Sequence, residues 1–483
     1  MRISLQLIIV ALSFGLTSFA IADDNSAVTT TPLNAQTTNT QPLNTQPANA
    51  QGTNTNSKKV SLIDIYNQAL SRDPVLASAN SANKAAQEII EQGKALYRPT
   101  VNLNAGASAS KTDVKFNGGT NPFRGGRNSF EGYNYNLEAR QPIFRKQNLI
   151  QMDQTITQVS QADKQYHLTQ QQLILRSTQA YFDVLLAQDK IDLLAAQKVA
   201  ILSQLDQANA NFEVGTATVT DVNEAQARFD LVLAQEIAAV NEYDVATYAV
   251  QAITGDFPNK LAPVKPDIQV VQLTQKMQDW LDVAAINNLT IQIQQDAFTL
   301  ADQEVARAQA GHLPTLDAVV NYSDTYSNGS ANGFGNELKN GTIGLQLSIP
   351  LYQGGAISSR ARQAVLNKQK AADDVEIARR QTALETQRAY LNLSTSIAQV
   401  KALDQALISS QSQLNSTKLG YEVGVRTGVD VLNAQQQFFS AKRDLLQARY
   451  SYLVNIIRLK SAAGMVAEPD LQDINQQLVV TSQ

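Results

Sequence analysis

The segment Phe212-Glu213-Val214-Gly215 recurs as Tyr421-Glu422-Val423-Gly424, with residue numbers that differ by 209 (421 minus 212). The same offset relates three further pairs: Tyr181 and Tyr390, Asp221 and Asp430, and Gly255 and Gly464. One shared motif could be a coincidence, but a register kept from Tyr181 to Gly255 is not. The chain therefore contains two copies of one structural unit.

Upstream of these motifs the offset changes, and four prolines mark where it does so. Pro99 matches Pro314 and Pro142 matches Pro350. Between the prolines of each copy, apolar and polar residues alternate with a period of two, as in strands with one apolar face. The alternating runs are residues 101–110, 133–140, 316–322 and 343–349. We therefore predict four strands in two hairpins, with these prolines at their boundaries.

Period-two strands with aromatic residues near their ends are typical of outer-membrane barrels. Two exposed hairpins packed on a soluble core would give the same pattern, so the alternation leaves both possibilities open. In a membrane, four strands cannot close a barrel, because the edge strands would leave backbone groups unpaired in lipid. The membrane interpretation therefore requires several copies: a dimer for eight strands, a trimer for twelve or a tetramer for sixteen.

The remaining sequence of each copy predicts helices of two lengths. Residues 144–211 and 357–419 contain no Pro or Gly, and each would form a helix roughly 100 Å long. Helices of about half that length are expected at residues 62–96, 222–253, 280–310 and 431–463. Two half-length helices placed end to end would match one long helix, so we expect coiled-coil-like packing of stacked half-helices beside each long one.

The N-terminus predicts export from the cytoplasm. Residues 1–22 combine a basic start, an apolar run and an Ala-Ile-Ala site, which is typical of a cleaved signal peptide. An uncleaved anchor helix is the alternative. Residues 23–57 form a low-complexity Thr/Asn/Gln/Pro segment that we expect to be disordered. The repeats then occupy 58–255 and 280–464, with a linker at 256–279 and a C-terminal tail at 465–483.

The composition excludes several classes of protein. The chain has no Cys and two His, so we expect no metal site and no cofactor. A net charge of −4 with 17% charged residues argues against nucleic-acid binding. No nucleophile, base and orienting acid form a catalytic constellation, and no Walker A motif is present, so we predict that the protein is not an enzyme and draws its energy from a partner.

The turns after the long helices carry the candidate functional residues. Gly215 and Gly424 are natural helix stops, because the residue after a C-cap favours positive φ. Asp221 and Asp430 lie three residues after a threonine, which is capping-box spacing. Asp430 could also form a ring of carboxylates around the axis of an oligomeric pore, attracting cations. A carboxylate can do both, so both interpretations stay open.

The chain strongly resembles the TolC family of outer-membrane channel-tunnel proteins. The resemblance covers nearly all of residues 60–464 and rests on four segments: 311–317 (GHLPTLD), 349–355 (IPLYQGG), 421–432 (YEVGVRTGVDVL) and 448–453 (ARYSYL). It implies an α+β fold, internally duplicated, in which a homotrimer forms a twelve-stranded membrane β-barrel continued by an α-helical barrel across the periplasm. It also implies location in the cell outer membrane, in contact with its lipid.

The resemblance further implies partners and a gate. The partners are a periplasmic membrane-fusion adaptor and an inner-membrane transporter of the RND, ABC or MFS type, for multidrug efflux or type I protein secretion. Asp221 with Tyr421, and Thr220 with Arg426, match residues whose contacts hold the periplasmic aperture shut. The better-known members carry a second acid where this chain has Asn433, so a single ring at Asp430 should bind cations more weakly.

We therefore expect a gated, porin-like exit duct. The alternative is a trimeric, outer-membrane-anchored structural or adhesive stalk. The mid-chain position of both hairpins favours the duct, since an adhesin usually has one anchor at one chain end.

Overall fold

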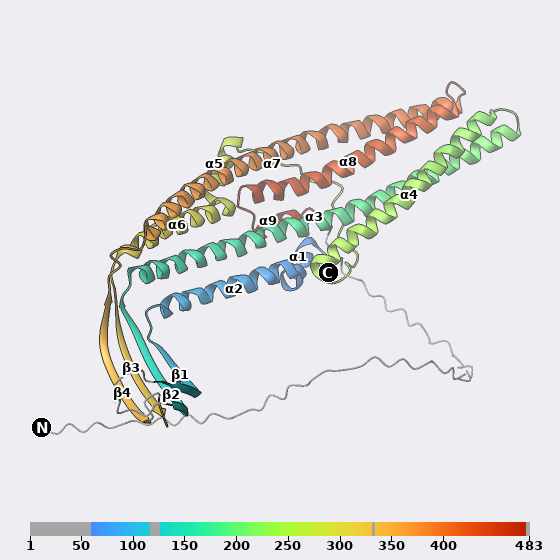
Figure 1. The fold of residues 1–483 in the computed structure, drawn as a ribbon. Helices are drawn as coiled ribbons and strands as arrows, with labels where there is room; N and C mark the ends of the chain where they lie inside the picture. Colours follow the sequence, from blue (N-terminus) through green and yellow to red (C-terminus); the bar gives the residue numbers. More distant parts are fainter. Residues whose placement is uncertain (1–58, 116–125, 331–333, 480–483) are drawn as a thin grey trace, which may run out of the picture. The chain divides into compact units, whose positions relative to one another are not determined.

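The computed structural model describes residues 59–115, 126–330 and 334–479 (Figure 1). The predicted signal peptide, residues 1–22, and the predicted disordered segment, residues 23–57, lie outside the described residues. The described elements follow one order twice: a half-length helical segment, two strands, a long helix and a shorter helix. Among the helices of this described part, none is long and apolar enough to cross a membrane.

The four predicted strands form one antiparallel sheet in the order β1–β2–β3–β4 (Figure 1). They are β1 (Thr100–Val114), β2 (Gly126–Phe144), β3 (Thr315–Ser327) and β4 (Asn336–Ser348). Each hairpin comes from one repeat, and β2 pairs with β3 to join the two. The strands are longer than the alternating runs, because polar residues at their ends continue the backbone ladder. In this described sheet, β1 and β4 each have a neighbour on one side only.

Three of the four prolines lie next to strands as predicted. Pro99 and Pro314 each precede the first residue of a strand, and Pro350 follows the end of β4. Pro142 differs: it lies inside β2, two residues before its end, where the register with β3 shifts. Proline has no amide hydrogen to donate to a ladder, so an irregularity at a strand end accommodates it.

The two long helices are confirmed as α3 (Lys146–Glu213) and α7 (Ala356–Glu422). A short turn reverses the chain after each, into α4 (Val219–Thr254) and α8 (Gly428–Ala462), which pack back along the same long helix. These four helices agree with the predicted ranges to within a few residues.

The other two half-length segments are each two helices rather than one, which corrects the prediction. Residues 62–96 form α1 (Leu62–Arg72) and α2 (Pro74–Ala95), and residues 280–310 form α5 (Met277–Asn287) and α6 (Leu289–Gln309). Asp73 lies between α1 and α2 with its carboxylate accepting from the amide of Leu76, and Pro74 starts α2. The residue before a proline disfavours helical backbone, so Asp73-Pro74 is a stop signal that the apolar periodicity concealed.

The predicted end-to-end stacking is confirmed at both junctions (Figure 1). The end of α4 at Gly255 meets Arg72 at the break between α1 and α2, and Arg72 forms an ion pair with Asp256. In the second repeat, Gly464 after α8 meets Asn287 and Asn288 at the break between α5 and α6. The breaks themselves are 215 residues apart (288 minus 73), the same offset as Pro99 and Pro314.

The segments predicted as a linker and a tail pack against each other and against the helices. Residue Val60 bridges to Leu261, and Val264 bridges to Leu478. The tail contains a helix, α9 (Glu468–Asn475), which was not predicted. It buries Leu471 and Ile474 against the core, and its eight residues are too few for periodicity to identify.

Substitution of Gly464 tests whether the backbones are closely packed at the junction of α8 with α5 and α6. The φ of Gly464 is +72°, and a Cβ there would lie 2.6 Å from the carbonyl oxygen of Asn287. Gly424 has a similar φ of +79° with nothing within 4 Å of its Cβ position. We expect Gly424→Ala to lower the free energy of unfolding by about 1–2 kcal/mol through backbone strain alone. Gly464→Ala should cost clearly more, measured as the thermal unfolding midpoint. Equal losses would show that the junction is not closely packed.

Candidate functional site

The turn between α3 and α4 is built by a glycine that ends the long helix. Gly215 has a φ of +75°, and the amide of Thr216 donates to the carbonyl of Asn211 at 2.8 Å. In the second repeat Gly424 has a φ of +79°, and the amide of Val425 donates to Gly420 at 2.9 Å. Both turns are Schellman motifs, which confirms the predicted helix stops.

Both predicted capping boxes are present. The amide of Asp221 donates to the hydroxyl of Thr218, whose own amide donates to the Asp221 carboxylate at 2.9 Å. Asp430 and Thr427 form the same reciprocal pair. Each carboxylate therefore holds the start of a helix, as the capping interpretation predicts. The hydrogen bonds from the Thr427 backbone and side chain, and then the charge of Arg426, lower the pKa of Asp430, so this acid stays ionised.

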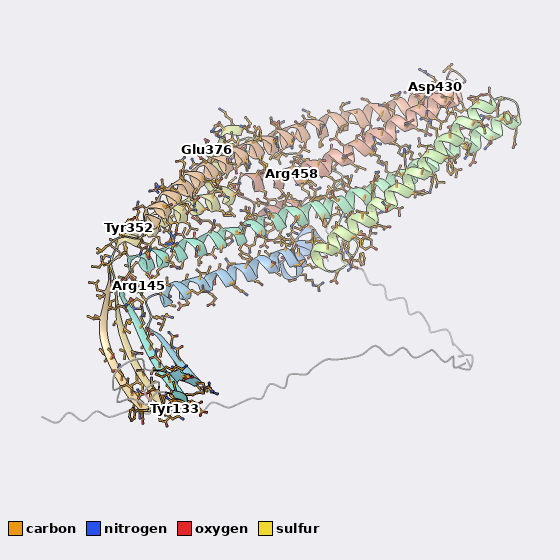
Figure 2. All side chains as sticks on the ribbon, in the orientation of Figure 1. Tyr133, Arg145, Tyr352, Glu376, Asp430 and Arg458 are labelled. Atoms are coloured by element: carbon orange, nitrogen blue, oxygen red, sulfur yellow. The ribbon has the colours of Figure 1, made fainter. Side chains whose placement is uncertain are left out.

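The two turns meet around one pocket of about 490 Å³. Three of the predicted gating residues line it: Asp221, Tyr421 and Arg426. Thr220 is exposed outside the pocket lining, and Asp430 also lies outside it, half-buried at the start of α8 (Figure 2). The structure thus brings together the side chains of both turns, without a direct bond between Asp221 and Tyr421 in the described residues.

Tyr421 instead bonds Asn211, a residue that the sequence analysis missed. The amide nitrogen of Asn211 donates to the Tyr421 hydroxyl at 2.9 Å, which ties the end of α3 to the end of α7. No spacing along the chain signals this contact: the repeat offset only pairs Asn211 with Gly420, which has no side chain.

A second hydrogen bond between the repeats lies near the starts of α4 and α8, just beyond the two turns. The guanidinium of Arg228 donates to the side-chain oxygen of Asn433 at 2.9 Å and pairs with Glu224 at 3.4 Å. Asn433 is the position where the resemblance would place a second acid. In this chain that side chain is an acceptor for α4 of the other repeat.

A third bond between the repeats lies in the core. The hydroxyl of Tyr450 on α8 donates to the carboxylate of Asp189 on α3 at 2.5 Å. Burial raises the pKa of Asp189, and the hydrogen bond from Tyr450 opposes that shift. The tyrosine pKa is raised as well, by burial and then by the neighbouring carboxylate. The bond is therefore strongest when Asp189 is ionised.

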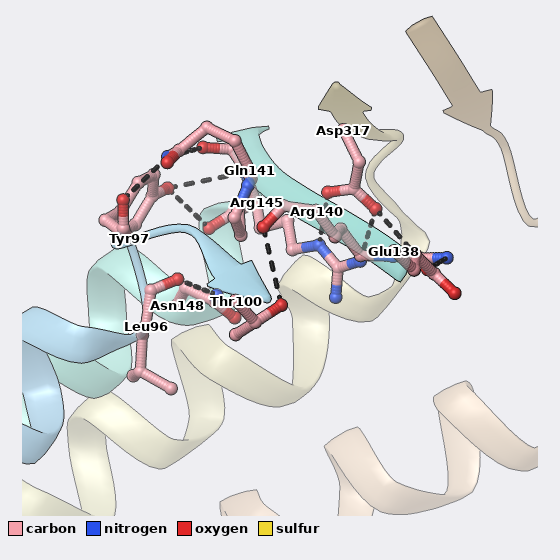
Figure 3. A network of polar contacts seen from close by, with 10 residues as sticks. Leu96, Tyr97, Thr100, Glu138, Arg140, Gln141, Arg145, Asn148 and Asp317 are labelled. Carbon is pink, nitrogen blue, oxygen red and sulfur yellow. Dashed lines mark hydrogen bonds and ion pairs between the residues drawn. The ribbon is translucent and has the colours of Figure 1, made fainter. Parts of the chain in front are cut away.

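A separate polar network joins the strands to the helices (Figure 3). Arg145, the N-cap of α3, donates through Nε to Asp317 of β3 at 2.8 Å. Arg140 of β2 also approaches this carboxylate, at 3.6 Å, and the Asp317 side chain is 5% exposed. Arg145 thus neutralises the buried carboxylate of Asp317, and Arg140 is shared between Asp317 and Glu138, which it meets at 3.2 Å. Asp317 belongs to a segment that carries the resemblance, but its partners are close only in the folded chain.

A family model described as "Outer membrane efflux protein" matches residues 65–256 and 280–465, one match for each repeat. The chain is 34% identical over 423 residues to "Outer membrane protein TolC" of Vibrio cholerae, covering 87% of this chain and 94% of that protein. It is 30% identical over 417 residues to "Alkaline protease secretion protein AprF" of Pseudomonas aeruginosa, covering 86% of each. The structure of the Campylobacter jejuni CmeC outer membrane channel shares the fold, with a TM-score of 0.71, 17% identity and coverage of 90% of this chain and 97% of that one.

The bond between Tyr450 and Asp189 predicts a pH-dependent loss of stability. Tyr450→Phe leaves a buried carboxylate without its donor, which should cost about 1–3 kcal/mol when Asp189 is ionised. The folded-state pKa of Asp189 then rises further above its unfolded value. Because the pKa of Asp189 is higher in the folded state than in the unfolded state, the free energy of unfolding is highest below the unfolded-state pKa. It falls as the pH rises through the folded-state pKa. Thermal unfolding midpoints should therefore differ more between variant and wild type near pH 8 than near pH 5.

Tyr452→Phe is the matched control for this measurement. The Tyr452 hydroxyl accepts from the backbone amide of Val271 at 2.9 Å, and that donor does not titrate. Its loss should be the same at both pH values. A pH-independent loss for Tyr450→Phe as well would contradict the role given to Asp189.

Proposed function

Because this chain belongs to the outer membrane efflux protein family, it is an outer-membrane exit duct, and we propose that three copies assemble to form the conducting pore. The observation that carries the proposal is the open four-stranded sheet. Its outer strands β1 and β4 have pairing edges that no other described strand covers. In lipid each edge must be paired, so several copies must join their sheets. Two, three or four copies would each give a number of strands within the range of known barrels, and we take three from the family resemblance, which implies twelve strands.

The exposed side chains of β4 support contact with outer-membrane lipid. Ile343, Leu345 and Leu347 lie on one face of the strand, and Ile343 is 83% exposed in the single chain. Their neighbours on the other face are Gly344, Gln346 and Ser348. An apolar outer face with a polar inner face is the pattern of a barrel strand around a water-filled lumen.

The two turns are proposed as the periplasmic aperture of this duct, with Asp221, Tyr421, Thr220 and Arg426 holding it closed. Arg426 forms no ion pair in the part of the chain that the structure describes, and Thr220 is exposed. Both are therefore available to a neighbouring copy. The bond from Asn211 to Tyr421 would hold the two turns of one copy together while the aperture is shut.

Transport through the duct requires partners, because the chain carries no nucleotide-binding motif. We propose a periplasmic adaptor and an inner-membrane transporter of the RND, ABC or MFS class as those partners. One relative is named for alkaline protease secretion and the family for efflux. The cargo is accordingly proposed to include exported proteins, small toxic compounds or both. A passive duct needs no catalytic residue of its own.

Single-channel recording of the purified protein in planar bilayers tests the duct and its gate together. The wild type should give defined conductance steps, and silence would contradict the duct. Tyr421→Phe and Arg426→Ser should each raise conductance, since one lost hydrogen bond shifts an equilibrium by about 0.5–1.5 kcal/mol. Asn211→Ala removes the donor of the same hydrogen bond to Tyr421 and should also raise conductance. The exposed tyrosine Tyr248 on α4 supplies the control, and Tyr248→Phe should change nothing. Unchanged conductance in all three gate variants would refute the gate.

A ring of three Asp430 carboxylates predicts block by multivalent cations. Asp430→Ala should weaken block by La³⁺ applied from the aperture side, because it removes every charge of the ring. The same variant also loses a helix cap, so Thr427→Ala is the matched control: it removes the capping hydroxyl but keeps the carboxylate. Block that falls equally in both variants would place Asp430 away from the pore axis.

A further inference from the structure

A pocket of about 310 Å³ lies beside α9, away from the turns described above. It lies between the inter-repeat segment around Val271 and helices α5, α7, α8 and α9. Its walls are mainly aliphatic: Leu393, Leu453, Ile456, Leu459 and Ile474. This volume is at the lower end of the range of ligand pockets, about 300–1,000 Å³.

One polar group in the wall has no partner. Trp280 lines the pocket and is 8% exposed, and its indole Nε1 is buried without a hydrogen-bond partner among the residues that the structure describes. The other aromatic residue of the wall, Tyr452, already accepts from the amide of Val271. The N–H is closed to solvent in the conformation that the structure describes, and a buried donor without an acceptor is costly. A turn of the indole toward the pocket would therefore let an acceptor from outside the chain pair with this N–H.

The rim of the pocket is acidic. Asp470 is neutralised by Lys460 and caps α9 through the amide of Ala467. Asp473, one turn further along α9, is exposed and has no ion pair within the described chain. The rim therefore presents one negative charge that no neighbouring cation balances.

We propose that this pocket binds a small amphiphilic cation that carries a hydrogen-bond acceptor. Its apolar chain packs on the aliphatic walls, its acceptor takes the N–H of Trp280, and its positive group lies at Asp473. A neutral hydrocarbon would leave the indole unpaired, and an anion would be repelled at the rim. The site is independent of the proposed aperture, and nothing in it requires the duct to be open.

The only tryptophan of the chain is Trp280, so its fluorescence reports directly on this pocket. The probe is octanoylcholine, which has an aliphatic chain, an ester acceptor and a quaternary ammonium group. Titrated into the full-length protein in phosphatidylcholine vesicles, it should give a saturable change in tryptophan emission. Octyltrimethylammonium lacks the acceptor and methyl octanoate lacks the charge, and each should bind more weakly than octanoylcholine.

Three variants test the assignment of the walls and the rim. Asp473→Asn should weaken binding about threefold to fivefold, as expected for one solvated ion pair. Glu468→Gln removes the same charge from the same helix at a residue outside the pocket lining, and should leave binding unchanged. Ile456→Phe fills the cavity and should abolish the saturable response. Single-channel conductance of each variant should match the wild type, which checks folding separately from binding.

Several outcomes would overturn the proposal. An emission change that never saturates, or that is the same in Ile456→Phe, would mean partition into lipid and no site. Equal weakening by Asp473→Asn and Glu468→Gln would reject the role of Asp473. Binding that appears only after truncation behind Val479 would mean that the chain's own last residues occupy the pocket. Loss of conductance in the wild type would reject the duct but leave this site standing.

Discussion

Helix α3 is 68 residues long, and no single helix of the described chain covers it from end to end. A helix within a protein gains most of its stability from packing its apolar face on its neighbours, so this length needs two neighbours placed in line. The chain meets the requirement with α4 and the α1–α2 pair, and again around α7 with α8 and the α5–α6 pair. At the second junction Gly464 lets the backbones approach closely, and at the first Gly255 supplies the left-handed end of α4 beside the side chain of Arg72.

Duplication gives the two repeats one backbone, but the polar contacts have diverged. At the first junction Asp73, with a side chain 1% exposed, pairs with Arg176 at 2.9 Å. Its counterpart Asn288 donates to the carbonyl of Ala462, so a charge is replaced by a neutral amide. At the turns, Asn211 bonds Tyr421 while its counterpart Gly420 lies against the side chain of Arg426. The contacts that tie the repeats together are therefore unequal, so the two turns of the proposed aperture share one backbone conformation but differ in their side-chain contacts.

The sheet and the turns show which features of the fold local sequence patterns can predict. Alternation located all four strands, and the Gly and Thr-x-x-Asp spacings located both helix stops and both caps, because these features depend on residues close together in the chain. Pairing of β2 with β3 depends on residues between 172 (316 minus 144) and 195 (327 minus 132) positions apart and was not predicted. Asp73-Pro74 was overlooked since helical periodicity continues across it. The short helix α9 was missed because eight residues give too little pattern.

The sequence by itself determined the duplication, the two long helices, the strands, the turn chemistry and the membership of the family. Each of these is written in local spacing or in repeated register, which need no knowledge of distant contacts. Only the tertiary structure decided which side chains meet: Asn211 with Tyr421, Asp189 with Tyr450, and Asp317 with Arg145. It also decided that Trp280 would be buried without an acceptor. The physical reason is that a hydrogen bond between repeats depends on how helices pack, and packing distances cannot be read from spacing along one chain.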